Sequence, residues 1–153
     1  MRNADAEQFV RHVWSAFLHE GVEAVLALAA EEARWRPHSA HGRRFVSTAE
    51  YREELARSAA AGERVEASAI GMWSHERVVV IRGRMRIRRR GDLLEDTRMY
   101  WLFEVRERRL AHVASSPDLA GLLREVGYDD PVLTREAFFA LHRDVPPPDG
   151  GGA

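Results

Sequence analysis

Thr97-Arg-Met-Tyr-Trp-Leu-Phe-Glu-Val105 is the stretch that decides the fold. Apolar residues recur at every second position, which is the pattern of a β-strand with one buried face. Met99, Trp101, Phe103 and Val105 share that face, because successive side chains of a strand point to opposite sides. Such a face carries too much apolar area to remain in water. We therefore expect the helices earlier in the chain to cover it.

The residues before Gly62 are predicted to be mostly helical. Apolar residues at helical spacing indicate an amphipathic helix that ends at Gly21 and a short helix after it. A third helix is expected from about Thr48 to Ala61, because Ser47 and Glu50 form a capping box at its start. Between these helices, the segment 33–37 predicts a short edge strand, since its Pro lacks a backbone donor.

After Gly62 the period changes from helical to alternating. Residues 63–115 are predicted to form an antiparallel meander of four strands, followed by a helix near 119–126 and a last helix near 134–142. Helices followed by a meander indicate an α+β fold. We expect a cone: N-terminal helices packed on a curved four-stranded sheet with a short extra strand, enclosing room for a small molecule.

The bulk composition excludes several functions. The chain has 153 residues, a formal net charge of −1 and no Cys. We expect one domain over residues 1–143 and a disordered Pro/Gly tail over 144–153. The balanced charge argues against nucleic acid as a partner, and the lack of Cys excludes thiolate chemistry. No signal peptide or membrane span is recognised, so a cytoplasmic protein without a membrane partner is expected.

The order of these elements resembles the SnoaL-like (polyketide cyclase-like) group of the nuclear transport factor 2-like superfamily. The resemblance is carried by Arg34-Trp-Arg-Pro-His38, by the helix start Ser47-Thr-Ala-Glu-Tyr51, and by Val78-Val-Val-Ile81 with the hairpin that follows. It implies a cone-shaped pocket for a hydrophobic or aromatic ligand, and it implies no cofactor. Members include cyclases, isomerases, dehydratases and epoxide hydrolases, so the fold alone does not select a reaction. The pocket residues that we expect are Trp14, Phe17, Trp35, Tyr51, Met99, Trp101, Phe103 and Val113.

The resemblance also directs attention to possible catalytic groups. Ketosteroid isomerases of this superfamily carry an acid just before the Pro of the short strand, where this chain has Arg36. Their second acid corresponds best to Trp101. The replacement base that we consider is His38, with His41 as the other choice, because a neutral imidazole is suited to proton transfer. Two His so close together also suggest a metal, but a solvated polar loop is the simpler interpretation, and we predict no metal site.

The sequence leaves open which way two groups of side chains point. Arg82, Arg84 and Arg86 share one face of the predicted strand over 78–89, and this face is either an anion site in the pocket or a solvated outer surface. His112 faces inward, as a candidate acid or base beside Trp101, or outward; the resemblance favours outward.

Two functional hypotheses follow. The first is a small-molecule pocket protein that acts as a cofactor-free lyase, isomerase or cyclase by proton transfer. The alternative is a non-catalytic ligand-binding or dimeric accessory protein whose cone is filled by side chains. In both cases we expect a homodimer through the outer sheet face, where Tyr100 and Leu102 leave apolar area.

Overall fold

One five-stranded sheet organises the chain. The computed structural model describes residues 3–143, so the tail predicted over 144–153 lies outside the described residues. The strand order is β1-β5-β4-β3-β2, with β1 parallel to β5 and all other neighbours antiparallel. The strands are β1 (Ala29–Arg36), β2 (Glu63–His75), β3 (Val78–Arg89), β4 (Asp92–Arg106) and β5 (Arg109–Ser116). The expected α+β fold, with a four-stranded meander and a short extra strand, is therefore confirmed.

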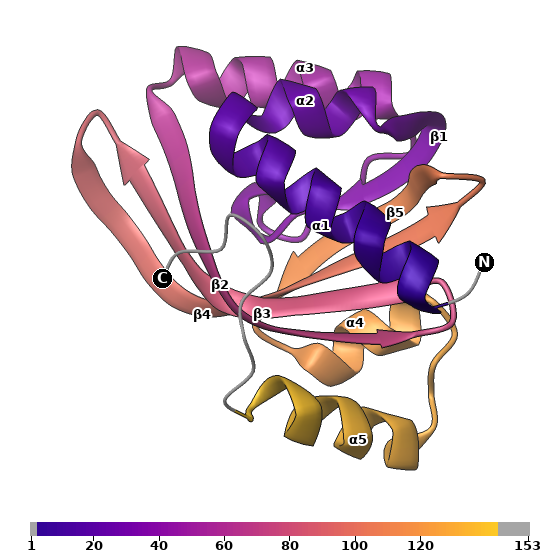
Figure 1. Cartoon of the computed structure of the whole chain (residues 1–153). Helices are drawn as coiled ribbons and strands as arrows, with labels where there is room; N and C mark the ends of the chain where they lie inside the picture. The colour runs from indigo at the N-terminus through magenta and orange to yellow at the C-terminus, as the bar shows by residue number, and fades with distance from the viewer. Residues whose placement is uncertain (1–2, 144–153) are drawn as a thin grey trace.

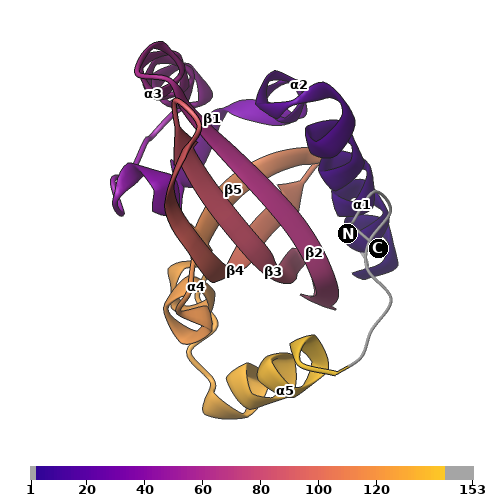
Figure 2. The same ribbon diagram turned by 90° about the vertical axis from the view of Figure 1, so that its left-hand side faces the viewer.

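Three helices cover the concave side of this sheet, as Figures 1 and 2 show. They are α1 (Asn3–Glu20), α2 (Val22–Ala27) and α3 (Thr48–Ala60), and a short 3-10 turn η1 (His38–Ala40) follows β1. Trp14 from α1, Trp35 from β1 and Phe103 from β4 belong to the same buried cluster between helices and sheet. The inward face predicted from the alternation of β4 is the face that the helices cover.

The start of α3 shows how local sequence places an element. Ser47 Oγ accepts a hydrogen bond from Glu50 N–H at 3.1 Å, and Glu50 Oε2 accepts one from Val46 N–H at 3.2 Å. Ser47 is the N-cap of α3, so the first bond satisfies one donor that a helix start otherwise leaves free, as the predicted capping box requires. The carboxylate of Glu50 reaches back one residue further than in that box, to Val46.

Two further helices cover the convex side (Figure 1). Helices α4 (Leu119–Glu125) and α5 (Pro131–Leu141) place Leu122, Leu123 and Leu141 against Tyr100 and Leu102 of β4. Leu102 is fully buried. The apolar area on which we based a homodimer through this face is therefore covered by the chain's own C-terminal helices, and that interface is wrong.

The sheet is strongly curled. At Gly83 of β3 two strands come so close together that no side chain fits. Gly83 pairs with Ala69 next to a register shift between Ala69 and Gly71 in β2. A Cβ atom at Gly83 would collide with the backbone carbonyl of Ser68. A bulge of this kind bends the strand that carries it and increases the local twist of the sheet. The curvature creates the concave side on which the candidate site lies.

None of the described helices is long and apolar enough to cross a membrane.

Candidate functional site

The interior of the cone carries a cluster of aromatic rings in which Trp14 contacts both Trp101 and Phe17. The rings of Trp14 and Trp101 meet edge to face with centroids 5.0 Å apart, and Phe17 lies 5.8 Å from Trp14. Met99 and Phe103, the inward neighbours of Trp101 on β4, are buried. Trp101 itself keeps part of its surface accessible, as do Phe17 and Val113. These three side chains are therefore only partly covered by the rest of the protein.

Trp35 and Tyr51 form a separate, closed part of the same cluster. Their rings stack with centroids 4.6 Å apart. Trp35 Nε1–H donates to Thr48 Oγ1 at 3.2 Å, and Thr48 donates to the carbonyl of Ala30 at 2.6 Å. Burial, aided by the negative charge of Glu54, raises the pKa of Tyr51 to about 12. Both residues were predicted for the pocket, and the structure gives them contacts that join α3 to β1.

His38 lies at the mouth of the cone, where η1 follows β1. Its Nε2 atom is 2.8 Å from Oε2 of Glu95, and its backbone N–H donates to Ser115 Oγ at 2.8 Å. Ser115 pairs with Trp101 across β5 and β4, so both point to the concave side. Glu95 shares the strand parity of Trp101 and pairs with Ile87. The structure therefore brings a His–carboxylate pair to the aromatic face.

Sequence reasoning missed Glu95. A signal was present: continuing the inward alternation of Met99 and Trp101 toward the N-terminus of the strand passes through Thr97 to Glu95. A carboxylate on the inward face of an apolar strand is unusual unless it has a partner. Both side chains of the pair are about one third accessible, at 30% for His38 and 35% for Glu95. A small molecule can therefore reach them.

One buried donor in the cone has no acceptor. Among the described residues, Nε1 of Trp14 makes no hydrogen bond, although Trp14 is only 2% exposed. Buried polar groups without partners are rare in folded proteins and call for an explanation.

The arginines of β3 face the convex side and the solvent. Arg84 and Arg86 both pair with Asp96, at 2.5 and 3.3 Å, and Arg82 Nε–H donates to the carbonyl of Leu141 in α5. The hydrogen bond from Arg84 is the largest effect that lowers the pKa of Asp96. These arginines are therefore part of a solvated outer surface and of the contact with α5, and they do not line the cone.

His112 also faces outward, beneath α4. Its Nε2 atom lies 3.4 Å from Glu125 Oε2, and Glu125 is held by Arg36 from β1. Burial lowers the pKa of His112, while the nearby charge of Glu125 opposes that shift. This cluster fastens α4 to the edge of the sheet, away from Trp101.

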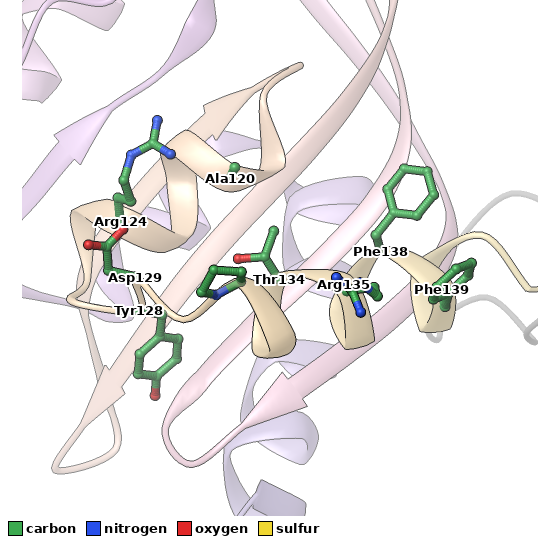
Figure 3. A pocket seen from close by; sticks show the side chains of 9 residues that line it. Ala120, Arg124, Tyr128, Asp129, Thr134, Arg135, Phe138 and Phe139 are labelled. Carbon is green, nitrogen blue, oxygen red and sulfur yellow. The ribbon is translucent and has the colours of Figure 1, made fainter.

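Two clefts are present on the convex side. One, of about 430 Å³, lies between α4 and α5 and is lined by Tyr128, Arg135, Phe138 and Phe139 among others (Figure 3). The other, of about 510 Å³, lies beside Arg36, Arg44, Arg124 and Glu125. Neither lining contains a His, and neither includes the pair at the mouth of the cone. The candidate site at His38 and Glu95, which rests on their 2.8 Å contact, therefore lies outside both clefts. Over residues 3–143, no group of three or more His, Asp or Glu could hold a metal ion.

The curled sheet with helices on its concave side is the nuclear transport factor 2-like fold. No protein-family model matches the sequence, and no curated protein matches it. Solved structures match with low sequence identity, so the likeness concerns the fold.

Three of these solved structures illustrate the range of proteins that share the fold. A protein from Catenulispora acidiphila DSM 44928 with a ketosteroid isomerase-like fold, in complex with trimethylamine, is 19% identical with a TM-score of 0.59; the match covers 78% of this chain and 92% of that one. A protein of unknown function from Burkholderia pseudomallei K96243 is 18% identical with a TM-score of 0.59, over 80% and 98%. An LEH-like epoxide hydrolase of M. tuberculosis is 14% identical with a TM-score of 0.62, over 91% and 96%.

Proposed function

We propose that this chain binds a hydrophobic or aromatic small molecule in the cone and moves a proton on it, as a cofactor-free isomerase, lyase or cyclase. The observation that carries the proposal is the 2.8 Å contact between His38 and Glu95 on the side of the sheet that bears Trp101. A titratable pair beside an aromatic, partly accessible face is the arrangement expected of an acid–base site.

The contact defines which atom of His38 does the chemistry. The Glu95 carboxylate can only accept a hydrogen bond, so Nε2 of a neutral His38 carries the hydrogen and donates it. Nδ1 is then the atom with a lone pair, and it is the proposed base. When Nδ1 takes a proton from an acidic C–H of the substrate, the ring becomes cationic and the Glu95 carboxylate stabilises that charge. The same proton can then return to another atom of the substrate.

The aromatic cluster supplies the binding surface in this proposal. Trp14, Phe17, Met99, Trp101, Phe103 and Val113 are the proposed lining. Trp101 is its floor, because it alone of the inward residues 99, 101 and 103 of β4 keeps accessible area. Trp35 and Tyr51 support the wall through their stacked rings. The epoxide hydrolase and the trimethylamine complex among the similar structures support a small molecule as the ligand class.

A proton-exchange experiment tests the proposal without knowledge of the natural substrate. α-Tetralone, a neutral aromatic ketone with acidic C–H groups, is incubated with the protein in D₂O, and its loss of α-hydrogen is followed by NMR. We expect the protein to accelerate exchange and His38→Gln to lower that acceleration by about 10²–10⁴-fold, the usual contribution of a general base. His41→Asn, in the same loop, is the matched control and should leave the rate unchanged.

Exchange that is equally fast without the protein, or unaffected by His38→Gln, would contradict the catalytic proposal.

Trp101→Leu separates the two hypotheses for the cone. If the cone binds a ligand, this variant keeps its melting temperature and loses ligand affinity. If side chains fill the cone, as in a non-catalytic accessory protein, the melting temperature falls clearly.

The homodimer remains a proposal, and we propose a different contact surface for it. Because α4 and α5 cover the sheet, we propose α5 as the contact, where Val132, Phe138 and Phe139 are exposed. Light scattering tests it, and a Phe139→Asp variant should then become monomeric.

A further inference from the structure

The inference concerns the cleft of about 510 Å³ beside α4, which we call the arginine cleft. Its lining holds three arginines from three segments: Arg36 at the end of β1, Arg44 in the loop before α3, and Arg124 on α4. Two acids, Asp118 and Glu125, also line it. At neutral pH the lining therefore carries more positive than negative charge.

Glu125 is the shared partner of two of these arginines. Its Oε1 atom accepts a hydrogen bond from Nε–H of Arg36 and lies 3.5 Å from Nη2 of Arg44. The Glu125 side chain is only 9% exposed, so it is held in place beneath both guanidinium groups. Each guanidinium has five N–H donors, and one carboxylate oxygen cannot accept from all of them. The terminal nitrogens of Arg36 make no hydrogen bond within residues 3–143, so they remain available to a ligand.

Arg124 has no acidic partner in the part of the chain that the structure describes. Its Nη2 atom lies 3.8 Å from the point that a Cβ atom on Gly121 would occupy, and Gly121 lines the arginine cleft. Figure 3 shows the side chain of Arg124 extending away from Phe138 and Phe139 of α5. Arg124 is exposed, and the side chain of Arg44 is 72% exposed. A solute can therefore reach both guanidinium groups.

We propose that the arginine cleft is a second ligand site, which binds the phosphate group of a small phosphate monoester. Guanidinium groups fit the oxygens of phosphates and carboxylates through paired N–H donors. A phosphate monoester offers three terminal oxygens and close to two negative charges, whereas a carboxylate offers two oxygens and one charge. Arginines that approach from three segments are better matched by the phosphate.

The cleft also leaves room for the organic part of such a ligand, because its volume lies in the range of small-molecule sites. It lies on the convex side of the sheet, whereas His38, Glu95 and Trp101 belong to the concave side. The proposal therefore does not depend on the function proposed for the cone.

The test uses three probes with the same polar backbone: glycerol 3-phosphate, glycerate and glycerol. All three are too polar to favour the apolar interior of the cone. Isothermal titration of the full-length protein at about pH 8, where the phosphate is a dianion, measures each affinity. We expect glycerol 3-phosphate to bind more tightly than glycerate, and glycerol not to bind. Added salt should weaken the binding, because both arginines at the rim are exposed.

Variants at the exposed arginines locate the binding. Arg44→Gln and Arg124→Gln should each lower the affinity for glycerol 3-phosphate by about 5- to 30-fold, the range from an exposed charge pair to a charge-assisted hydrogen bond. Arg135→Gln is the matched control, because it removes the same charge from an exposed position in the other cleft. Its affinity should equal that of the unmodified protein. Arg36 is left unchanged, because it holds Glu125 in place.

The acids give a test in the opposite direction. Asp118 is exposed, and its side chain makes no capping hydrogen bond at the start of α4. Asp118→Asn should therefore raise the affinity by about 2- to 5-fold without loss of the fold. Asp129→Asn, in the other cleft, should leave the affinity unchanged.

NMR on the unmodified chain provides a readout that no variant affects. Glycerol 3-phosphate should move the backbone amide resonances of Gly42 and Gly121, which line the arginine cleft, and leave that of Trp101 in place. Absence of binding, or equal losses in Arg124→Gln and Arg135→Gln, would overturn the proposed site. Glycerate binding as tightly as glycerol 3-phosphate would overturn the assignment of a phosphate. Neither result would affect the proton transfer proposed for the cone.

Discussion

Nε2 of His38 and Oε2 of Glu95 lie 2.8 Å apart, although 57 residues separate them in the chain. The contact spans the mouth of the cone, from the turn after β1 to the N-terminal part of β4. It fixes the orientation of an imidazole whose backbone is held by Ser115. A carboxylate that orients a base contributes less to the reaction rate than the base itself, and variants of the two residues measure the difference.

Glu95→Gln should lower the exchange rate of α-tetralone by about ten-fold or more, and by less than His38→Gln. The amide keeps the shape of the side chain but no longer stabilises the cationic ring. The double variant should be no slower than His38→Gln alone, because Glu95 acts through His38. Additive losses in the double variant would show that Glu95 acts by another route.

His112 should make the free energy of unfolding decrease with acidification. Burial lowers its pKa from the ordinary value of 6.5, so the unfolded chain takes up the proton first as the pH falls. The stabilisation is complete above about pH 6.5 and is lost as the pH falls through the folded-state pKa. Chemical unfolding from about pH 7.5 to pH 5 should show a shallower slope in His112→Asn. His12→Asn, at an exposed position of α1, should retain the slope of the unmodified protein.

Tyr51 should affect the free energy of unfolding at alkaline pH. Its pKa is raised to about 12, whereas the unfolded chain ionises near 10.0. The stability that its neutral form contributes is therefore present below about pH 10 and is lost as the pH rises toward 12. Tyr51→Phe should remove that part of the alkaline loss, as followed by unfolding experiments at increasing pH. A phenolate absorbance from Tyr51 in the folded protein near pH 10 would contradict the assignment.

Gly83→Ala should destabilise the fold by about 1–3 kcal/mol or more, because the added methyl group meets the backbone of Ser68 and the strands must separate. Gly71→Ala is the graded control. Its Cβ would lie 3.2 Å from the carbonyl oxygen of Leu141, a tight contact that a small shift relieves. Chemical denaturation should therefore show the larger loss at Gly83, and equal losses would argue against the collision.

The inward face of β4 was predictable from sequence, because alternation by itself separates Trp101 from Leu102. The position of α4 and α5 was not. Tyr100 and Leu102 required a cover, but periodicity does not say whether that cover comes from a second chain or from the same one. The C-terminal helices were predicted as helices; their packing on the convex side depends on contacts that no local pattern encodes.

The candidate site was predictable in part. His38 was named as a replacement for the acid that the family carries before the Pro of the short strand; the structure places it against Glu95, and its role as a base stays a prediction. Glu95 and the unpaired N–H of Trp14 were not found. The first depends on how far the β3–β4 hairpin extends beyond the helices, and the second on the absence of an acceptor in a three-dimensional neighbourhood. The alternation of β4 places Glu95 on the inward face, but its contact with His38, 57 residues away, cannot be read from spacing along the chain, and neither can the unpaired N–H.

The cover of the convex face by α4 and α5 also determines how the protein responds to dilution. A sheet face buried by a second subunit becomes exposed once the concentration falls below the dissociation constant. Here the covering segment is tethered through Ser116 and Pro117, so its effective concentration is set by the length of the connection and not by the amount of protein. Burial of Tyr100 and Leu102 is therefore retained at any dilution.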